Sequence, residues 1–388
     1  MVITEDIFPC APGALFRGIS NSFWLRLCRT VQEMAAFLSG CSRDPLVLMD
    51  AGKRLSDLNQ PILEIRNLSV TYRGSPHFVH AVRDVSLSLA EGETLALAGE
   101  TGSGKSTVAL SVLGLLNAQA QAGEILFRGR SIHSLTPGEW RTIRGGQIGI
   151  VFQDSRSALN PVLTISEHVI ETLRAHQKLA KRKARERALE VLQEVGIRED
   201  QANLHPFALS GGTCQRAGIA LALCNEPALL IADEPTSSID TAIQAQILDL
   251  LQFLKRRRRL ALLLISHDLP LISHVSERIA VMYHGQIVES GLREEVLTAP
   301  AHPYTRGLIA CQPSMRHHHE KNPLAAIPGA LPAAGQEMPG CAFAPRCSQA
   351  EALCTGSVPA ARALSATRRV ACVKASGDLD GRRKAESP

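Results

Sequence analysis

The chain has 388 residues, which is enough for one large domain with appendages or for two domains. Hydrophobic residues make up 45% of it and charged residues 20%, the composition of a globular protein with a substantial core. The 42 basic and 37 acidic residues give a net charge of +5, too small an excess to indicate nucleic-acid binding by itself.

The first 60 residues show little sustained periodicity and carry none of the motifs described below. We interpret residues 1–60 as an extension of unknown role, with Met49 as a candidate biological start. Glu5 and Asp6 stand where a signal peptide would carry basic residues, and no apolar run is long enough to span a bilayer. We therefore expect a cytoplasmic protein whose link to a membrane comes through a partner.

Strand patterns begin after residue 60. Residues 62–72 and 81–89 alternate apolar and polar side chains, which predicts antiparallel strands, and residues 124–127 add another. Four further segments are continuous apolar runs, as is typical of strands buried on both faces of a parallel sheet. These runs are residues 94–98, 147–152, 228–232 and 260–265.

Residues 99–106 follow the first apolar run and match the phosphate-loop pattern Gly, four residues, Gly, Lys, Ser. Glycines free the backbone to point successive amide N–H groups at phosphate oxygens, and a predicted helix over 106–116 adds its N-terminal dipole. Lys105 can reach the β- and γ-phosphates, and the Ser106 hydroxyl can ligate Mg²⁺. The sequence therefore predicts nucleoside triphosphate binding. The candidate contacts are Gly99, Glu100, Thr101, Gly102, Ser103, Gly104, Lys105, Ser106 and Thr107.

Residues 167–194 and 211–223 are predicted helices, and the basic stretch 178–187 is interpreted as a solvated helix face. The second helix follows Leu209-Ser210-Gly211-Gly212, whose serine hydroxyl and glycine amides form another helix N-terminus able to bind phosphate. The basic run 255–259 is expected to end a further helix, where cations complement the dipole.

Two carboxylates, Asp233 and Glu234, follow the apolar run 228–232. Asp233 can hold Mg²⁺ or its waters at the strand end, and Glu234 is placed to orient or deprotonate an attacking water. Gln153 and His267 come just after two other buried strands. The Gln153 amide can contact Mg²⁺ or water, and a neutral His267 can contact the γ-phosphate.

In this order and spacing, these motifs resemble the nucleotide-binding domain of ABC ATPases over about residues 61–300. The resemblance implies an α/β fold of the P-loop class: a RecA-like parallel sheet, an antiparallel β subdomain, and a helical subdomain at about 155–225. It implies that Tyr72 stacks on adenine and that Asp240 contacts the opposite subunit.

The resemblance also implies a mechanism. Two such domains meet head to tail, and each ATP lies between the phosphate loop of one subunit and Ser210, Gly211 and Gly212 of the other. Glu234 is then the base, and Mg²⁺, Lys105 and His267 stabilise charge on the transferred phosphoryl group.

Finer similarities are to the ATPase subunits of oligopeptide and dipeptide importers, with nickel importers as close relatives. They rest on Asn160-Pro161 and on residues 243–247, 302–306, 327–329 and 340–347, and they define a C-terminal extension at 301–388. Such importers combine two related ATPases, two permeases and an extracytoplasmic substrate-binding protein. We expect a paralogous ATPase or a second copy as partner, at the cytoplasmic face of the membrane, and no nucleic acid.

Two positions depart from the family pattern after the signature glycines, where Thr213 and Cys214 replace the usual Gln or Met and a basic or amide residue. Ser238 and Ile239 likewise replace Ala and Leu. We therefore expect the nucleotide site that this signature completes on its partner to be the weaker of two. Cys214 lies where the helix dipole favours a thiolate, and the alternative is an inert surface thiol.

The segment after residue 300 is rich in Pro, Gly and Ala and is expected to be a separate, loop-rich appendage. Its cysteines, Cys341, Cys347, Cys354 and Cys372, are candidate ligands for an iron–sulfur cluster or, second, a tetrahedral Zn²⁺. A metal would stabilise a segment poor in large apolar side chains. The spacing lacks a Cys-x-x-Cys pair, so ordinary packing thiols are the alternative. We interpret the nearby histidines 317–319 as a solvated loop.

These features predict the ATP-hydrolysing subunit of a membrane importer for di- or oligopeptides, and a nickel or metal-chelate importer is the nearest alternative. A non-transport ABC ATPase acting on ribosomes or DNA would usually carry a second ATPase domain or a long coiled coil, and the sequence contains a single phosphate loop. A regulatory module that binds ATP without turnover would not need Glu234 and His267.

Overall fold

The computed structural model describes residues 61–74, 78–237, 239–312, 326–333 and 336–375. The proposed extension 1–60, with Met49, lies outside the described residues, as do Ser238 and the histidines 317–319. Residues 59–388 form one compact unit, described here by itself.

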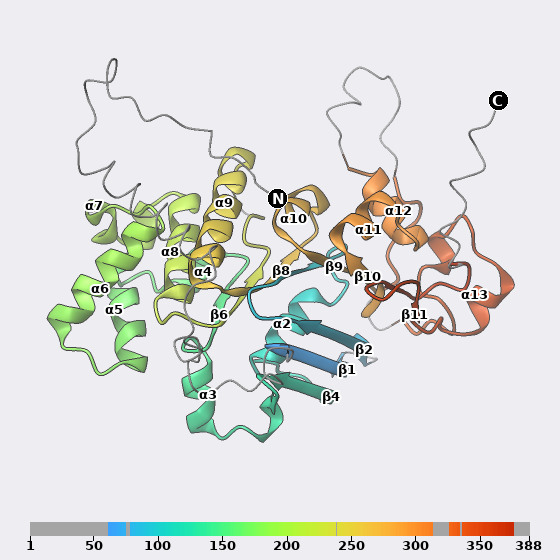
Figure 1. The fold of residues 1–388 in the computed structure, drawn as a ribbon, viewed down its shortest axis with the longest axis horizontal. Helices are drawn as coiled ribbons and strands as arrows, with labels where there is room; N and C mark the ends of the chain where they lie inside the picture. Colours follow the sequence, from blue (N-terminus) through green and yellow to red (C-terminus); the bar gives the residue numbers. More distant parts are fainter. Residues whose placement is uncertain (1–60, 75–77, 238, 313–325, 334–335, 376–388) are drawn as a thin grey trace, which may run out of the picture. The chain divides into compact units, whose positions relative to one another are not determined.

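A four-stranded antiparallel sheet follows residue 61, in the order β2-β1-β4-β5 (Figure 1). Its strands are β1 (Leu63–Tyr72), β2 (Val79–Leu89), β4 (Ala120–Phe127) and β5 (Arg130–Ser131). Leu63 pairs with Leu89 on one side and with Phe127 on the other, and all three side chains are buried. The alternating patterns thus correctly predicted the antiparallel strands.

An eight-stranded sheet forms the centre of the molecule, in the order β11-β12-β10-β9-β3-β8-β7-β6. The strands from β9 to β6 are parallel, and β10 and β12 are antiparallel additions. Every residue of β3, β7 and β8 is buried, which confirms the strands predicted from apolar runs. The strands are β3 (Thr94–Ala98), β6 (Ile148–Val151), β7 (Leu229–Asp233), β8 (Ala261–Ser266), β9 (Arg278–Tyr283), β10 (Gln286–Leu292), β11 (Arg362–Ala363) and β12 (Arg369–Val370).

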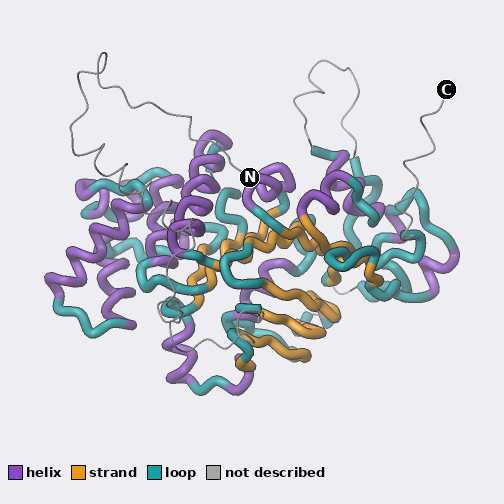
Figure 2. The backbone as a smooth tube through the Cα atoms, viewed as in Figure 1, coloured by secondary structure: helices purple, strands orange, loops and turns teal. Residues whose placement is uncertain are grey.

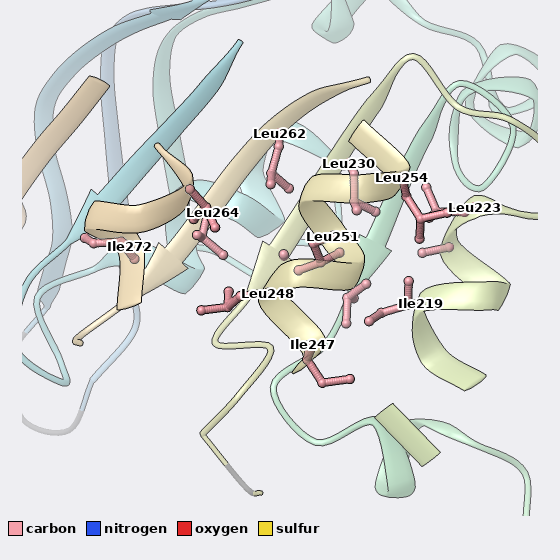
Figure 3. Packing of buried hydrophobic residues seen from close by; sticks show 14 of the residues in the cluster. Ile219, Leu223, Leu230, Ile247, Leu248, Leu251, Leu254, Leu262, Leu264 and Ile272 are labelled. Atoms are coloured by element: carbon pink, nitrogen blue, oxygen red, sulfur yellow. The ribbon is translucent and has the colours of Figure 1, made fainter. Parts of the chain in front are cut away.

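Helices cover the central sheet and form a separate group between β6 and β7. Figure 3 shows Leu248 and Leu251 of α9 close to Leu264 of β8 and Leu230 of β7, which places one apolar helix face on the sheet. The α-helices are α2 (Lys105–Val112), α3 (Pro137–Ile143), α4 (Ser155–Ala158), α5 (Ile165–His176), α6 (Lys181–Glu194), α7 (Glu199–Ala202), α8 (Gly211–Leu223), α9 (Thr241–Arg258), α10 (Leu269–Val275), α11 (Arg293–Thr298), α12 (Pro303–Ala310) and α13 (Ala352–Gly356).

The single helix predicted over 167–194 is wrong, because the structure contains two helices, α5 and α6, joined by residues 177–180. Both helices have one buried face, with Val169 and Leu173 on α5 and Ala188 and Val191 on α6. The two helices pack against each other and against α8. An unbroken helix over 167–194 would extend for about 42 Å, so its two halves could not pack against each other. Helix α2 also ends earlier than predicted, at Val112.

The basic run at 255–259 ends α9, as predicted. Lys255 Nζ lies 2.7 Å from Glu277 Oε1, and Arg258 pairs with Glu194 of α6. Part of the run is therefore used in contacts between elements of the fold.

The C-terminal segment is loop-rich, as Figure 2 shows, but it is not separate from the core that contains the central sheet. Strand β12 pairs with β10, and Tyr304 of α12 and Phe343 are buried in the same core as the central sheet. Glu289 of β10 is fully buried and accepts hydrogen bonds from Arg368 Nε at 3.1 Å and Nη2 at 2.5 Å. These contacts join the segment to the sheet, which its composition did not reveal.

Within the described part of the chain, no helix combines the length and the apolar character needed to cross a membrane.

Candidate nucleotide-binding site

The phosphate loop, residues 99–106, joins β3 to α2 at the carboxyl end of the central sheet. Gly99 has φ +150° and Gly104 has φ +103°, conformations that side-chain-bearing residues rarely adopt. A Cβ atom at Gly99 would lie 2.2 Å from the Met282 carbonyl oxygen, and one at Gly104 would lie 2.3 Å from that of Ala81. The loop is therefore packed tightly between β9 and β2, and neither glycine can be replaced without moving backbone.

Lys105 is folded back onto this loop. Its ammonium donates hydrogen bonds of 2.8 Å to the carbonyl oxygens of both Gly99 and Glu100 and lies 3.4 Å from Ser103 Oγ. Lys105 is only 5% exposed, and burial lowers its pKa. The ammonium thus sits inside the loop, where phosphate oxygens can replace the carbonyl groups as its partners.

Asp233 and Ser106 lie together at the end of β7. The Ser106 hydroxyl hydrogen-bonds to the Asp233 carboxylate. Burial raises the pKa of Asp233 above its ordinary value, although this hydrogen bond acts in the opposite direction. Asp233 Oδ1 is buried and has no hydrogen-bond partner among the described residues. An unpaired buried carboxylate oxygen beside a hydroxyl is a good fit for Mg²⁺, which prefers oxygen ligands.

Glu234 lies at the centre of a second cluster. Its Oε1 is 3.1 Å from His267 Nδ1, and its Oε2 accepts a 3.3 Å hydrogen bond from Gln153 Nε2. Its backbone has φ +45°, uncommon for a residue with a side chain, and its N–H donates to the Ile265 carbonyl at 2.9 Å. The side chains that follow β6, β7 and β8 therefore converge on one carboxylate, because the carboxyl ends of these parallel strands lie at the same edge of the sheet.

Tyr72, the expected adenine contact, is the last residue of β1 and is half-buried. It pairs with Val79, two residues before Ala81, whose carbonyl backs Gly104. The strand that carries Tyr72 is thus hydrogen-bonded to the strand that supports the phosphate loop.

Ser210 is the N-cap of α8, and its Oγ accepts a 3.2 Å hydrogen bond from the Thr213 N–H. Ser210 Oγ also lies 2.8 Å from Thr213 Oγ1, so the two hydroxyls share a hydrogen bond at the exposed helix end. Gly211 is exposed, whereas Gly212 is buried, and a Cβ atom on Gly212 would lie 2.9 Å from Ile243 Cγ2. Helix α8 packs on α4, α5 and α6, within the helical group.

Cys214 is buried, with 1% of its surface exposed, and its thiol donates to the Pro206 carbonyl at 3.5 Å. Both expectations for this residue, a reactive thiolate open to reagents and an inert surface thiol, are therefore wrong about its exposure. The reason is its position on α8, where Cys214, Ala217 and Ala220 follow one another at helical spacing on the face that enters the core.

Sequence reasoning missed two residues beside the site. Gln244 Nε2 donates to the carbonyl oxygens of Thr236 at 3.0 Å and Ile239 at 3.1 Å, and so supports the loop that leads to the exposed Asp240. Arg346 forms an ion pair with Glu100 of the phosphate loop, with 2.8 Å between Nη1 and Oε2. Both residues lie in segments singled out only for their family likeness.

The four late cysteines, Cys341, Cys347, Cys354 and Cys372, line one small cavity of about 20 Å³. Burial raises the pKa of Cys341 and Cys347. Among the described residues, no group of three or more His, Cys, Asp and Glu side chains is arranged to hold a metal ion. This arrangement does not fit a tetrahedral zinc site, because four zinc ligands must surround one ion.

Two family models match the chain. The ABC transporter model matches residues 82–237, and the model of the oligopeptide/dipeptide transporter C-terminal region matches residues 288–354. The first match contains the phosphate loop and both carboxylates, and the second contains Tyr304, Arg346 and three of the four late cysteines.

Relatives named as peptide import ATP-binding proteins cover most of the chain. One from Brucella abortus (strain 2308) is 43% identical over 303 residues, which is 77% of this chain and 91% of the relative. Another from Brucella melitensis biotype 1 is 42% identical over 331 residues, 81% of this chain and 97% of the relative.

Solved structures of ATP-binding cassettes share the fold. A dimeric cassette in a post-hydrolysis state, bound to ADP and Pi, has a TM-score of 0.55 and 31% identity and covers 60% of this chain and 98% of its own. The cbiO1 protein of Clostridium perfringens, part of the ABC transporter complex cbiONQ, has a TM-score of 0.54 and 28% identity and covers 62% of this chain and 92% of its own.

Proposed function

This chain belongs to the ABC transporter family, in its oligopeptide/dipeptide branch, and from that membership we propose that it powers the import of di- or oligopeptides through a membrane complex. It is an ABC-type ATPase of the α/β, P-loop class. The observation that carries the peptide assignment is the joint match of the ATPase core and the C-terminal region, together with the names of the relatives.

We propose the following roles for the site residues. The loop from Gly99 to Thr107 binds the triphosphate, with Lys105 on the β- and γ-phosphates, and Tyr72 stacks on adenine. Glu234 accepts a proton from the attacking water. Gln153 and His267 contact the two carboxylate oxygens of Glu234 and keep them in position. His267 is half-exposed and so is free to contact the γ-phosphate as well.

Mg²⁺ would be held by Asp233, Ser106 and Gln153, and would neutralise charge on the phosphates when bound. The unpartnered Asp233 Oδ1 supports this assignment. We also propose that Ser210, Gly211 and Gly212 of one subunit complete the nucleotide site of the other and that Asp240 contacts the opposite subunit. The exposed N-terminus of α8 leaves Ser210 open to such a partner.

The chain is expected to work as a dimer with transmembrane permeases. The finer proposal is a paralogous ATPase as the second subunit, or a second copy of this chain, bound with two permeases at the cytoplasmic face of the membrane. An extracytoplasmic binding protein would then supply the peptide, and no nucleic acid is involved. The domain boundaries that go with this proposal are 61–300 for the ATPase, with helices at about 155–225, and 301–388 for the extension.

An iron–sulfur cluster at Cys341, Cys347, Cys354 and Cys372 is a further part of the proposal. Its support is the convergence of the four thiols on one cavity. In a cluster the four cysteines can bind different irons, so they need not surround a single ion as zinc ligands do. The cluster would stabilise the loop-rich segment that contains these residues.

Uptake measurements test the transport proposal. In the host organism, deletion of this gene should abolish uptake of a radiolabelled tripeptide, and the intact gene, but not Lys105→Ala, should restore it. The same strains should take up radioactive nickel at the wild-type rate. Loss of nickel uptake with normal peptide uptake would support the metal importer instead, and normal uptake of both would contradict an importer role.

A further inference from the structure

Glu100 is the second residue of the phosphate loop, and all its polar groups have partners. Its carboxylate accepts hydrogen bonds from Arg346 Nη1 at 2.8 Å and Nη2 at 3.2 Å. Its N–H donates to Tyr304 Oη at 3.0 Å, and its carbonyl oxygen accepts the 2.8 Å bond from Lys105 Nζ. Two residues of the C-terminal segment therefore bind Glu100, and Glu100 in turn binds Lys105.

Arg346 is itself held in place. Its side chain is 6% exposed, Nε donates to the Pro328 carbonyl at 3.0 Å, and the guanidinium carbon lies 5.9 Å from the centre of the Tyr283 ring. A two-pronged arginine–carboxylate contact fixes direction as well as distance, which a lysine cannot reproduce. Arg346 thus constrains where the Glu100 side chain can lie.

An aromatic cluster supports both contacts. The rings of Tyr283 and Tyr304 are 4.5 Å apart, and the Phe343 ring lies 5.3 Å from each of them. Tyr283 is on β9, Tyr304 is on α12, and Phe343 precedes the turn that carries Arg346. Packed aromatic groups in a buried core move little, so they keep Tyr304 and Arg346 in fixed positions relative to the phosphate loop.

We propose that Arg346 is a positioning residue for ATP binding, and that the C-terminal segment braces the phosphate loop through Glu100. The brace fixes the Glu100 peptide group, and with it the carbonyl oxygen that holds Lys105 and the N–H next to the Gly99 turn. Without Arg346, the loop samples other conformations, and ATP binds a smaller fraction of the molecules. This inference rests on the proposed role of Lys105 in phosphate binding.

The test is equilibrium binding of a fluorescent ATP analogue to the purified full-length chain, with a thermal melt on every variant. Arg346→Met should raise the Kd about tenfold, the size of effect expected from losing a charge-assisted contact. Arg346→Lys should give an intermediate value. Arg369→Met is the matched control, because Arg369 is exposed in the same segment and does not contact the loop; its Kd should equal wild type.

A double-mutant cycle separates positioning from general stability. Glu100→Gln should raise the Kd. Adding Arg346→Met should raise the Kd no further, because both substitutions remove the same contact between Arg346 and Glu100. Additive effects, or an unchanged Kd in a folded Arg346→Met protein, would overturn the proposal. If Arg346→Met does not fold, Arg346→Lys and Glu100→Gln decide by the same criteria.

The Lys105→Ala variant distinguishes failure of the proposed phosphate site from failure of the proposed positioning role of Arg346. If this variant binds the analogue as tightly as wild type, the proposed phosphate site is wrong. If it binds weakly while every folded Arg346 variant binds normally, the site stands and the brace is wrong.

Discussion

His267 and Glu234 meet at the carboxyl end of the parallel sheet, with Nδ1 of the histidine 3.1 Å from Oε1 of the glutamate. They come from the ends of β8 and β7, which are neighbouring strands. The carboxylate is 10% exposed and the imidazole 51%, so the carboxylate is shielded while the histidine reaches solvent. This arrangement suits a carboxylate that acts on one water and a histidine that contacts the nucleotide.

Glu234→Gln should bind ATP with the wild-type Kd and lose about 10²–10⁴-fold in turnover, the range that general base catalysis supplies. The amide keeps the shape of the side chain but cannot accept the proton, so the complex should accumulate as a closed ATP-bound dimer. Turnover with the partner subunits and size-exclusion chromatography with ATP measure both effects. Glu186→Gln, on the exposed surface of α6, is the control. Wild-type turnover in Glu234→Gln would remove the base assignment.

In a heterodimer with a related ATPase, the two nucleotide sites should be unequal. Thr213 Oγ1 engages Ser210 Oγ at 2.8 Å, so the signature serine offered to the partner's nucleotide already has a hydrogen-bond partner. Lys105→Ala should therefore reduce transport more than the equivalent change in the partner, since Lys105 belongs to the stronger site. Equal losses from the two changes would contradict the asymmetry.

Thr213→Val tests the cause of this inequality. Valine removes the competing hydroxyl at nearly constant volume, so turnover at the weaker site should increase. Thr142→Val, on the exposed side of α3, should leave turnover unchanged. A Thr213→Val protein with wild-type or lower turnover would show that this hydrogen bond does not limit the site.

The free energy of unfolding should decrease as the pH decreases, because His302 is neutral in the folded protein but takes up a proton in the unfolded chain. Burial lowers the pKa of His302 from 6.5 to about 4, and its Nδ1 accepts a 3.0 Å hydrogen bond from the Tyr304 N–H. Below the ordinary pKa the unfolded chain takes up a proton that the folded chain does not. The free energy of unfolding should then drop by up to about 1.4 kcal/mol per pH unit as pH falls toward 4.

Urea melts of wild type and His302→Asn between pH 7 and about pH 4 would measure this contribution. Asparagine can still accept the bond from the Tyr304 N–H as a helix cap but does not titrate. The variant should therefore lose less stability over this range than wild type. Identical pH profiles would show that His302 is not the group responsible.

Protein purified without oxygen should be brown and contain iron if the four late cysteines hold a cluster. Cys347→Ser should remove the colour and the iron and make the C-terminal segment sensitive to protease, because a ligand and its stabilisation are lost. Cys224→Ser, at the end of α8, should keep the colour, because Cys224 does not line that cavity. Colourless wild-type protein without iron would leave the four residues as ordinary thiols.

The parts of the fold that sequence predicted well are those set by local pattern. The apolar runs 228–232 and 260–265 predicted buried parallel strands, and the structure contains them as β7 and β8. The sequence also indicated the polar residues after these runs as candidate site residues, but not that His267 and Gln153 meet on Glu234. What sequence missed depends on tertiary packing. The break between α5 and α6 has no Gly or Pro to mark it, and the burial of Cys214 depends on which side of α8 meets the core. Arg346 and Glu100 are 246 positions apart, so their contact has no local signal.

The pairing of β10 with β12 has a consequence for where this protein can be cut. A version ending at residue 300, where the ATPase motifs end, would remove Arg368 and the backbone N–H groups of Ala301 and His302, which bind the Glu289 carboxylate in the intact protein. It would also uncover the edge of β10, and exposed strand edges promote association between chains. We expect such a truncated protein to aggregate, whereas a cut after residue 375 would leave the whole sheet intact.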